Sequence, residues 1–145
     1  MSLRTFCFAI AACLMGACAQ MPGGPPPSPP PGARILKCDT PTCAVKVAIK
    51  CEAYIFCWID VDNDWIQVRP GNSPEITWEI TTSGYRFSDN GIAFPAGSPF
   101  TCHRAEAGRR FMCNDRHSEK GIYKYAITVL GFPFVFPKDP WVDNQ

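Results

Sequence analysis

The stretch Val45-Lys46-Val47-Ala48-Ile49-Lys50 decides the fold class that we expect for this chain. Its apolar residues Val45, Val47 and Ile49 occupy alternate positions, with lysine or alanine between them. An apolar period of two is typical of a β-strand that buries one face and exposes the other to water. The stretch therefore predicts a half-buried strand in a sheet with one solvated face.

The same alternation recurs at three places further along the chain, in residues 65–69, 76–81 and 123–129. Residues 54–61 are apolar on both faces, as expected of a central strand. Clusters of Asp, Asn, Gly, Ser and Pro predict turns at residues 62–64, 70–74, 88–91 and 118–121. Residues 103–110 are expected to form a turn or two of helix at most, because Gly108 weakens it. This spacing predicts an all-β domain, an antiparallel β-sandwich, over residues 38–145.

Residues 1–17 have the features of a secretory signal peptide. Arg4 precedes a run of about ten apolar residues, which is too short to span a bilayer. Two small residues then lead into Cys18, and this ending resembles the lipobox of bacterial lipoproteins, in which the cysteine is acylated and becomes the new N-terminus. The resemblance implies that Cys18 is the lipidated residue. Cys13 is the alternative position, and an ordinary cleaved signal is the competing interpretation.

Acylation at Cys18 would anchor the protein to the lipid bilayer of a bacterial cell envelope. In the lipoprotein family an aspartate after the cysteine often signals inner-membrane retention, so Ala19 implies the outer membrane, facing the periplasm. Residues 21–34 are rich in proline and glycine and predict a semi-rigid polyproline II spacer of roughly 40 Å. Residues 18–37 are therefore expected to form a tether. A proline-rich ligand for an aromatic groove is the weaker alternative.

Cysteine usage favours an oxidising compartment. Of the nine cysteines, Cys7 and Cys13 would leave with the signal and Cys18 would carry lipid. The other six predict a disulfide framework in a small exported domain. Sequence alone allows many pairings, and we expect Cys38–Cys43, Cys51–Cys57 and Cys102–Cys113. A structural zinc site is disfavoured, because the spacings Cys38-x4-Cys43 and Cys113-x3-His117 match zinc motifs poorly.

The second half of the chain carries a resemblance in its core-forming segments. These are Ile76-Thr77-Trp78-Glu79-Ile80, Gly84-Tyr85-Arg86-Phe87, Gly91-Ile92-Ala93-Phe94, residues 121–129 and Asp139-Pro140-Trp141. They resemble small, uncharacterised bacterial proteins with a cupredoxin-like or immunoglobulin-like sandwich. A blue-copper site needs two histidines, a cysteine and usually a weak axial ligand. In that family the ligands follow the strand equivalent to 121–129, whereas His103, Met112 and His117 precede it, so we expect no copper and no other cofactor.

Two polar clusters have residue types that occur in functional sites. Asp60, Asp62 and Asp64 offer oxygen ligands for calcium, but the glycine and glutamate that an EF-hand loop requires are missing. Asp115, His117 and Ser118 have the residue types of a catalytic triad. Neighbouring residues on an extended chain point to opposite faces, however, which separates nucleophile from base.

No other catalytic or metal-binding residue is predicted. Glu75 and Glu79 alternate with apolar residues and are expected to face water, which does not suit the paired carboxylates of a glycosidase. The net charge is only +1. Acidic residues dominate 52–89 and basic residues dominate 102–124, which predicts a dipolar domain. A basic loop suits an anionic glycan, but the interspersed acids argue against nucleic acid.

Residues 131–137, Gly-Phe-Pro-Phe-Val-Phe-Pro, predict an edge strand, because proline blocks the donors of a sheet ladder. We expect Phe132, Phe134 and Phe136 to cover the core, and the alternative is an exposed patch that marks a protein partner.

The sequence thus predicts a lipid-anchored envelope protein, disulfide-braced and all-β, that serves as a non-catalytic binding or structural module. An envelope protein or an anionic glycan is the candidate partner. The competing class is a small envelope enzyme or a carrier of calcium or copper.

Overall fold

The computed structural model describes residues 28–53, 55–117 and 119–145. The regular secondary structure of these residues is almost all β, and strands make up 58% of the structure. The strands are β1 (Ile35–Cys38), β2 (Thr42–Glu52), β3 (Phe56–Val61), β4 (Trp65–Val68), β5 (Glu75–Ile80), β6 (Arg86–Ala93), β7 (Phe100–Ala105), β8 (Arg110–Asp115), β9 (Gly121–Lys124), β10 (Ala126–Leu130), β11 (Val135–Phe136) and β12 (Trp141–Asn144). One 3-10 turn, η1 (Glu106–Gly108), lies between β7 and β8. Within these residues, no helix has the length and apolar character needed to cross a membrane.

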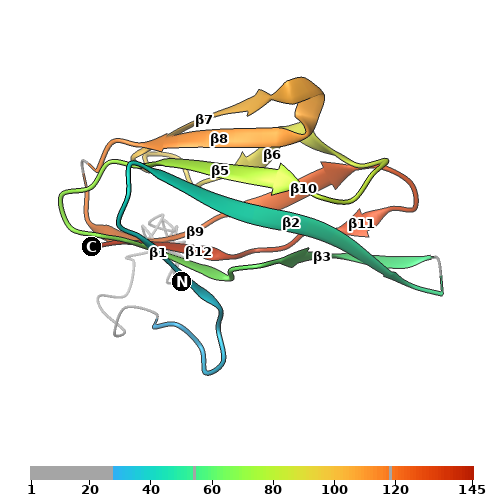
Figure 1. The fold of residues 1–145 in the computed structure, drawn as a ribbon, viewed down its shortest axis with the longest axis horizontal. Coiled ribbons are helices and arrows are strands. Elements are labelled where there is room, and N and C mark those ends of the chain that lie inside the picture. Colours follow the sequence, from blue (N-terminus) through green and yellow to red (C-terminus); the bar gives the residue numbers. More distant parts are fainter. Residues whose placement is uncertain (1–27, 54, 118) are drawn as a thin grey trace, which may run out of the picture.

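The strands form three sheets that curl around one core (Figure 1). A six-stranded sheet has the order β11-β3-β2-β5-β8-β7, and a four-stranded sheet has the order β1-β4-β12-β9. The remaining pair is β10 with β6. All three sheets contribute to a single cluster of buried apolar side chains, so the chain from β1 to β12 forms one domain.

The expectation of a purely antiparallel arrangement is wrong. Strand β2 pairs antiparallel with β3 but parallel with β5, and β4 pairs parallel with both β1 and β12. Strand β11 also lies parallel to β3. The parallel pair β2 and β5 arises because the chain leaves the six-stranded sheet after β3, forms β4 in the other sheet, and returns as β5 in the direction of β2.

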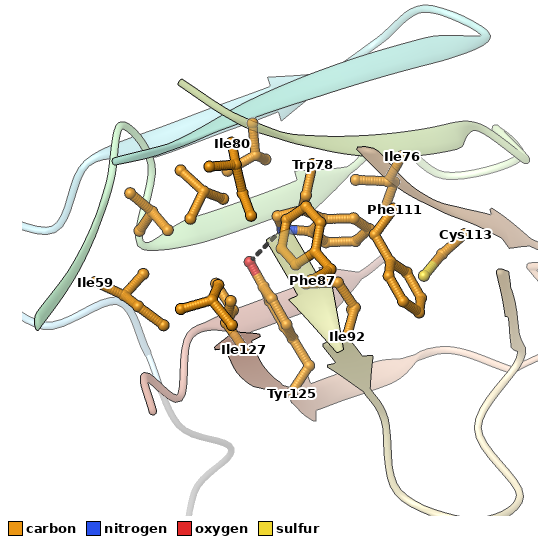
Figure 2. Packing of buried hydrophobic residues seen from close by; sticks show 14 of the residues in the cluster. Ile59, Ile76, Trp78, Ile80, Phe87, Ile92, Phe111, Cys113, Tyr125 and Ile127 are labelled. Carbon is orange, nitrogen blue, oxygen red and sulfur yellow. Dashed lines mark hydrogen bonds between the residues drawn. The ribbon is translucent and has the colours of Figure 1, made fainter. Parts of the chain in front are cut away.

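The alternating pattern correctly identified the core residues of β2 and β5, but in β4 Trp65 is buried as well as Ile66 and Val68. In β2 the side chains of Val45, Val47 and Ile49 are buried, and in β5 Trp78 lies between two buried isoleucines. Figure 2 shows the indole of Trp78 pointing toward Tyr125, and its Nε1–H donates a hydrogen bond to the Tyr125 hydroxyl at 3.1 Å. The polar atoms of both rings thus bond to each other inside an apolar cluster.

Two predicted elements differ in the structure because distant residues decide them. Residues 123–129 alternate as one strand would, yet they divide into β9 and β10 at Tyr125, whose N–H donates to the carbonyl of Pro140 at 3.0 Å. Residues 88–91 do not reverse the chain but lie within β6, where the register against β10 shifts. Gly91 is required there, because a Cβ atom at this position would lie 2.6 Å from the Cβ of Phe87.

Two further expectations need correction. Half of the segment 103–110 is strand, and its only helical part is the 3-10 turn η1. Strand β3 is not buried on both faces, since Cys57, Ile59 and Val61 face the core while Phe56 and Trp58 face outward. The turns expected at 62–64 and 70–74 do connect β3 to β4 and β4 to β5.

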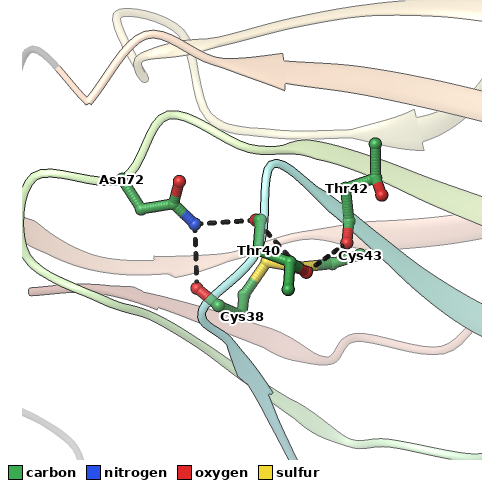
Figure 3. The surroundings of a disulfide bond; sticks show 5 residues. All are labelled: Cys38, Thr40, Thr42, Cys43 and Asn72. Atoms are coloured by element: carbon green, nitrogen blue, oxygen red, sulfur yellow. Dashed lines mark hydrogen bonds between the residues drawn. A yellow bond between two sulfur atoms is a disulfide. The ribbon is translucent and has the colours of Figure 1, made fainter.

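All three expected disulfide pairs are confirmed. Cys38 bonds to Cys43, Cys51 to Cys57, and Cys102 to Cys113. The last two link directly opposed residues of antiparallel neighbours. The first closes the link between β1 and β2, where the side-chain amide of Asn72 donates to the carbonyls of Cys38 and Thr40 at 3.0 and 2.8 Å (Figure 3).

Candidate functional site

The outward face of β3 carries large apolar side chains in contact with solvent. Phe56 is 61% exposed and Trp58 is 43% exposed, whereas Cys57 and Ile59 between and beside them are buried. Ile55, at the tip of the hairpin formed by β2 and β3, is also mainly exposed. An isolated exposed apolar residue is ordinary, but neighbouring ones on one face require an explanation.

The segment that contains β11 extends this face. Strand β11 lies parallel beside β3 with Phe136 opposite Trp58, and Val135 between the phenylalanines is buried. Phe132, Phe134 and Phe136 are 93%, 67% and 60% exposed. The expectation that these phenylalanines cover the core is therefore wrong, because only Val135 points inward. The prediction of an edge strand is confirmed, since β11 ends the six-stranded sheet.

We define the aromatic surface as Phe56, Trp58, Phe134 and Phe136, with Ile55 and Phe132 at its ends. The rings of Phe134 and Phe136 contact edge to face, with centroids 5.5 Å apart. Figure 1 shows the hairpin of β2 and β3 and the strand β11 at the same end of the molecule. The Cys51–Cys57 disulfide joins the two strands of that hairpin beneath the surface.

Charged residues border the aromatic surface on its β2 side. Lys50 lies opposite Trp58 and Glu52 lies opposite Phe56 in the antiparallel register of β2 and β3. The Lys50 ammonium pairs with the carboxylate of Asp60 at 2.5 Å, two residues beyond Trp58 on the same face. The surface therefore has an aromatic centre and a charged rim.

The aspartates at and just after the end of β3 are bound by other groups of the protein, two of them by cationic side chains. Arg34 binds Asp60 and Asp64 at 3.0 Å each, and Lys138 binds Asp64 at 2.9 Å. Asp62 accepts the backbone N–H of Lys46 at 2.9 Å. These contacts leave the three carboxylates without the shared open position that a calcium ion would need.

The ion pairs move the pKa values of two of these carboxyls. The hydrogen bond from Lys50, with that from Arg34, lowers the pKa of Asp60 below its usual range. Partial desolvation raises the pKa of Asp64, but the hydrogen bonds from Arg34 and Lys138 outweigh it, so that pKa is lowered as well. Both aspartates therefore stay ionised in the folded protein at neutral pH.

Asp115 and His117 do not form a nucleophile-activating pair. The buried Asp115 carboxylate accepts the backbone N–H of His117 at 2.8 Å and the side-chain amide of Asn144 at 3.3 Å. The imidazole Nε2 of His117 accepts the N–H of Gly71 at 3.3 Å. Burial raises the pKa of Asp115. The hydrogen bonds of Asp115 and His117 thus join β8 to β12 and to the 70–74 turn. Ser118 lies outside the described residues.

The remaining candidates lie on three neighbouring strands of the six-stranded sheet. His103 of β7 lies opposite Met112 of β8, and Glu75 and Glu79 lie on β5. In the part of the chain that the structure describes, no three His, Cys, Asp or Glu side chains are gathered as metal ligands. The basic segment is partly neutralised by acids, since Arg104 pairs with Asp89 at 2.8 Å and Arg110 with Glu106 at 2.7 Å.

Phe56 and Trp58 were not predicted to be surface residues. The sequence contains one indication of their exposure. Asp60 lies two residues beyond Trp58 and therefore on the same face of the strand, and a carboxylate on that face indicates that the face contacts solvent. Cys18 and Cys13, the predicted lipidation positions, lie outside the described residues. A search of family models and of curated proteins finds no match to this chain.

Proposed function

We propose that this chain is a lipid-anchored protein of a bacterial cell envelope that binds a partner protein and has no chemistry of its own. The signal-like N-terminus and the cysteine before the proline-rich segment support export and acylation at Cys18. The three disulfides support folding in an oxidising compartment. The β-sandwich of cupredoxin-like or immunoglobulin-like type, in this proposal, presents the binding surface.

One observation carries the binding role, which is the exposure of Phe56, Trp58, Phe134 and Phe136 on one face of the six-stranded sheet. Aromatic residues are enriched at the centres of protein interfaces, where they supply most of the binding energy, and polar residues form the rim. The aromatic surface has this composition, with Lys50, Glu52 and Asp60 at its border.

The charged rim favours a protein over the bilayer as the occupant of this surface. Insertion of Phe56 and Trp58 into lipid would bring the neighbouring carboxylates of Glu52 and Asp60 toward the hydrocarbon, where charge is costly. A protein partner can satisfy the same carboxylates and the Lys50 ammonium with its own polar groups. The aromatic surface therefore suits an envelope protein with an apolar patch.

The anchor and the surface are tested separately in the native host. Cys18→Ser is expected to move the protein from the membrane to the soluble fraction, while Cys13→Ser leaves it membrane-bound. Continued membrane association of Cys18→Ser counts against the anchor.

For the surface, a photo-crosslinking residue replaces Phe134, and the same residue at the exposed Asp89 on β6 is the control. A crosslink to one protein from Phe134 only is the expected result. Crosslinks to lipid, to a second copy of this chain, or equally from both positions contradict the proposed partner.

A further inference from the structure

A second candidate site lies on the four-stranded sheet, where the end of the proline-rich segment meets two tryptophans. It is a cleft of about 350 Å³ whose lining includes Pro30, Pro31, Trp65, Lys138, Asp139 and Trp141. This volume falls at the lower end of the range for small-molecule sites, roughly 300–1,000 Å³. None of its lining residues belongs to the aromatic surface.

The proline-rich wall of the cleft is held in place by hydrogen bonds. The N–H of Ala33 donates to the carbonyl of Pro30 at 3.0 Å, which closes a turn with Gly32 at φ +82°. A positive φ at this position favours glycine, and proline before it suits the turn. The carbonyl of Arg34 then accepts the N–H groups of Asp64 and Trp65 at 2.9 and 3.1 Å, so this wall is attached to the start of β4.

The opposite wall consists of two neighbouring indoles. Trp65 on β4 and Trp141 on β12 are directly opposed in a parallel pair, and their rings stack with centroids 6.0 Å apart. Trp65 is only 1% exposed, whereas Trp141 is partly exposed. The buried Nε1–H of Trp65 has no hydrogen-bond partner among the described residues. This nitrogen is closed to solvent, so a ligand in the cleft would contact the partly exposed Trp141 ring and not this donor.

The rim of the cleft is polar and close to electrically neutral. Lys138 binds Asp64 at 2.9 Å, and Asp139 binds Lys124 at 2.8 Å. Paired ammonium and carboxylate groups offer both donors and acceptors, with little net field to attract an ion. Such a rim suits a ligand that carries hydroxyl groups and no charge, and an apolar ligand would leave the rim groups without new partners.

We propose that this cleft binds a neutral saccharide unit. The C–H face of a pyranose ring would pack on the partly exposed indole of Trp141 beneath the Pro30 turn. Ring hydroxyls would bond to Lys138, Asp64 and Asp139. The site is independent of the aromatic surface and of the lipid anchor, so its test does not depend on either.

The test is a titration of the purified full chain with chitotriose, cellotriose and maltotriose, monitored by tryptophan fluorescence and by calorimetry. At least one trisaccharide is expected to bind saturably with a millimolar dissociation constant. Trp141→Ala should weaken that binding by about tenfold or more.

Trp58→Ala on the aromatic surface is the matched control and should leave saccharide affinity unchanged. Circular dichroism of each variant checks that it remains folded. The proposal is overturned if none of the three saccharides binds, or if Trp141→Ala binds as tightly as the parent chain. Binding of a polyproline peptide in place of the saccharides would overturn it in favour of a peptide groove.

Discussion

At the scale of single residues, the core depends on one polar contact inside an apolar cluster. The Trp78 Nε1–H donates to the hydroxyl of Tyr125, and both side chains are almost completely buried (Figure 2). Burial raises the pKa of Tyr125, while the hydrogen bond from Trp78 acts in the opposite direction. The pair thus places two polar atoms in the core without leaving either unsatisfied, as buried polar groups require.

Trp78→Phe is expected to lower the free energy of unfolding by about 2–4 kcal/mol, measured by urea denaturation. The smaller ring leaves space in the core, and the Tyr125 hydroxyl loses its donor. Tyr125→Phe is the second arm of a double-mutant cycle with Trp78→Phe. The two losses should overlap by about 1 kcal/mol because they remove the same bond. Fully additive losses would show that the hydrogen bond contributes nothing to stability.

At the scale of elements, the edge strand of the six-stranded sheet separates a buried residue from exposed aromatic residues. Val135 of β11 is 4% exposed and contributes to the core, while Phe134 and Phe136 on either side are mainly exposed. The alternation across these three residues follows directly from the two-residue period of a strand. Only the inward residue should therefore matter for stability.

The variant carrying both Phe134→Ser and Phe136→Ser is expected to stay within about 0.5 kcal/mol of the parent in unfolding free energy. Val135→Ala should lose about 1–2 kcal/mol, because two buried methyl groups are removed. Thermal and urea unfolding measure both effects. If the double serine variant loses as much stability as Val135→Ala, the phenylalanines cover the core after all and the aromatic surface is not a free binding face.

Features of the fold that follow from local sequence patterns were predictable, and features that depend on contacts with distant residues were not. The burial of Val45, Val47 and Ile49 follows from the two-residue period alone. The three disulfides join cysteines at short sequence separations of 5, 6 and 11 residues. By contrast, the break at Tyr125 depends on the carbonyl of Pro140, which no local pattern reveals.

The two candidate sites were hidden for the same reason. Trp58 and Phe136 are almost eighty residues apart in sequence, which is roughly the length of a small domain. They become neighbours only because β11 pairs with β3. Trp65 and Trp141 face the same cleft only because β12 returns beside β4. The phenylalanine segment and the proline-rich segment are each evident in the sequence, but the segment that lies beside each of them is set by sheet topology.

At the scale of the whole molecule, one ion-pair network fastens the end of the proline-rich segment to the domain. Arg34 binds Asp60 and Asp64, which flank the turn between β3 and β4, and Lys138 before β12 binds Asp64 as well. The network therefore joins Arg34, just before β1, to the six-stranded sheet through Asp60 and to the four-stranded sheet through the residues that precede β4 and β12. Its members are partly exposed, so each contact contributes modestly and is screened by salt.

This network should make stability depend on pH in a defined direction. The pKa values of Asp60 and Asp64 are lower in the folded protein than the ordinary value of 3.8. Their contribution is therefore complete above that value and is lost as the pH falls through the folded pKa values. The buried Asp115 has the opposite sign, because its raised pKa makes the folded state more favourable as it takes up a proton.

Arg34→Gln is expected to lower the unfolding free energy at pH 7 by about 0.5–1 kcal/mol, after allowance for solvent screening. The difference from the parent chain should shrink in 1 M salt and disappear as the pH falls from 7 through the folded pKa values of Asp60 and Asp64. Lys37→Gln, at an exposed lysine of β1, is the charge-matched control and should show neither dependence. Urea denaturation of the three proteins across this pH range measures the effect. A difference for Arg34→Gln that is constant with pH and salt would mean that the arginine acts through packing of its side chain and not through the aspartates.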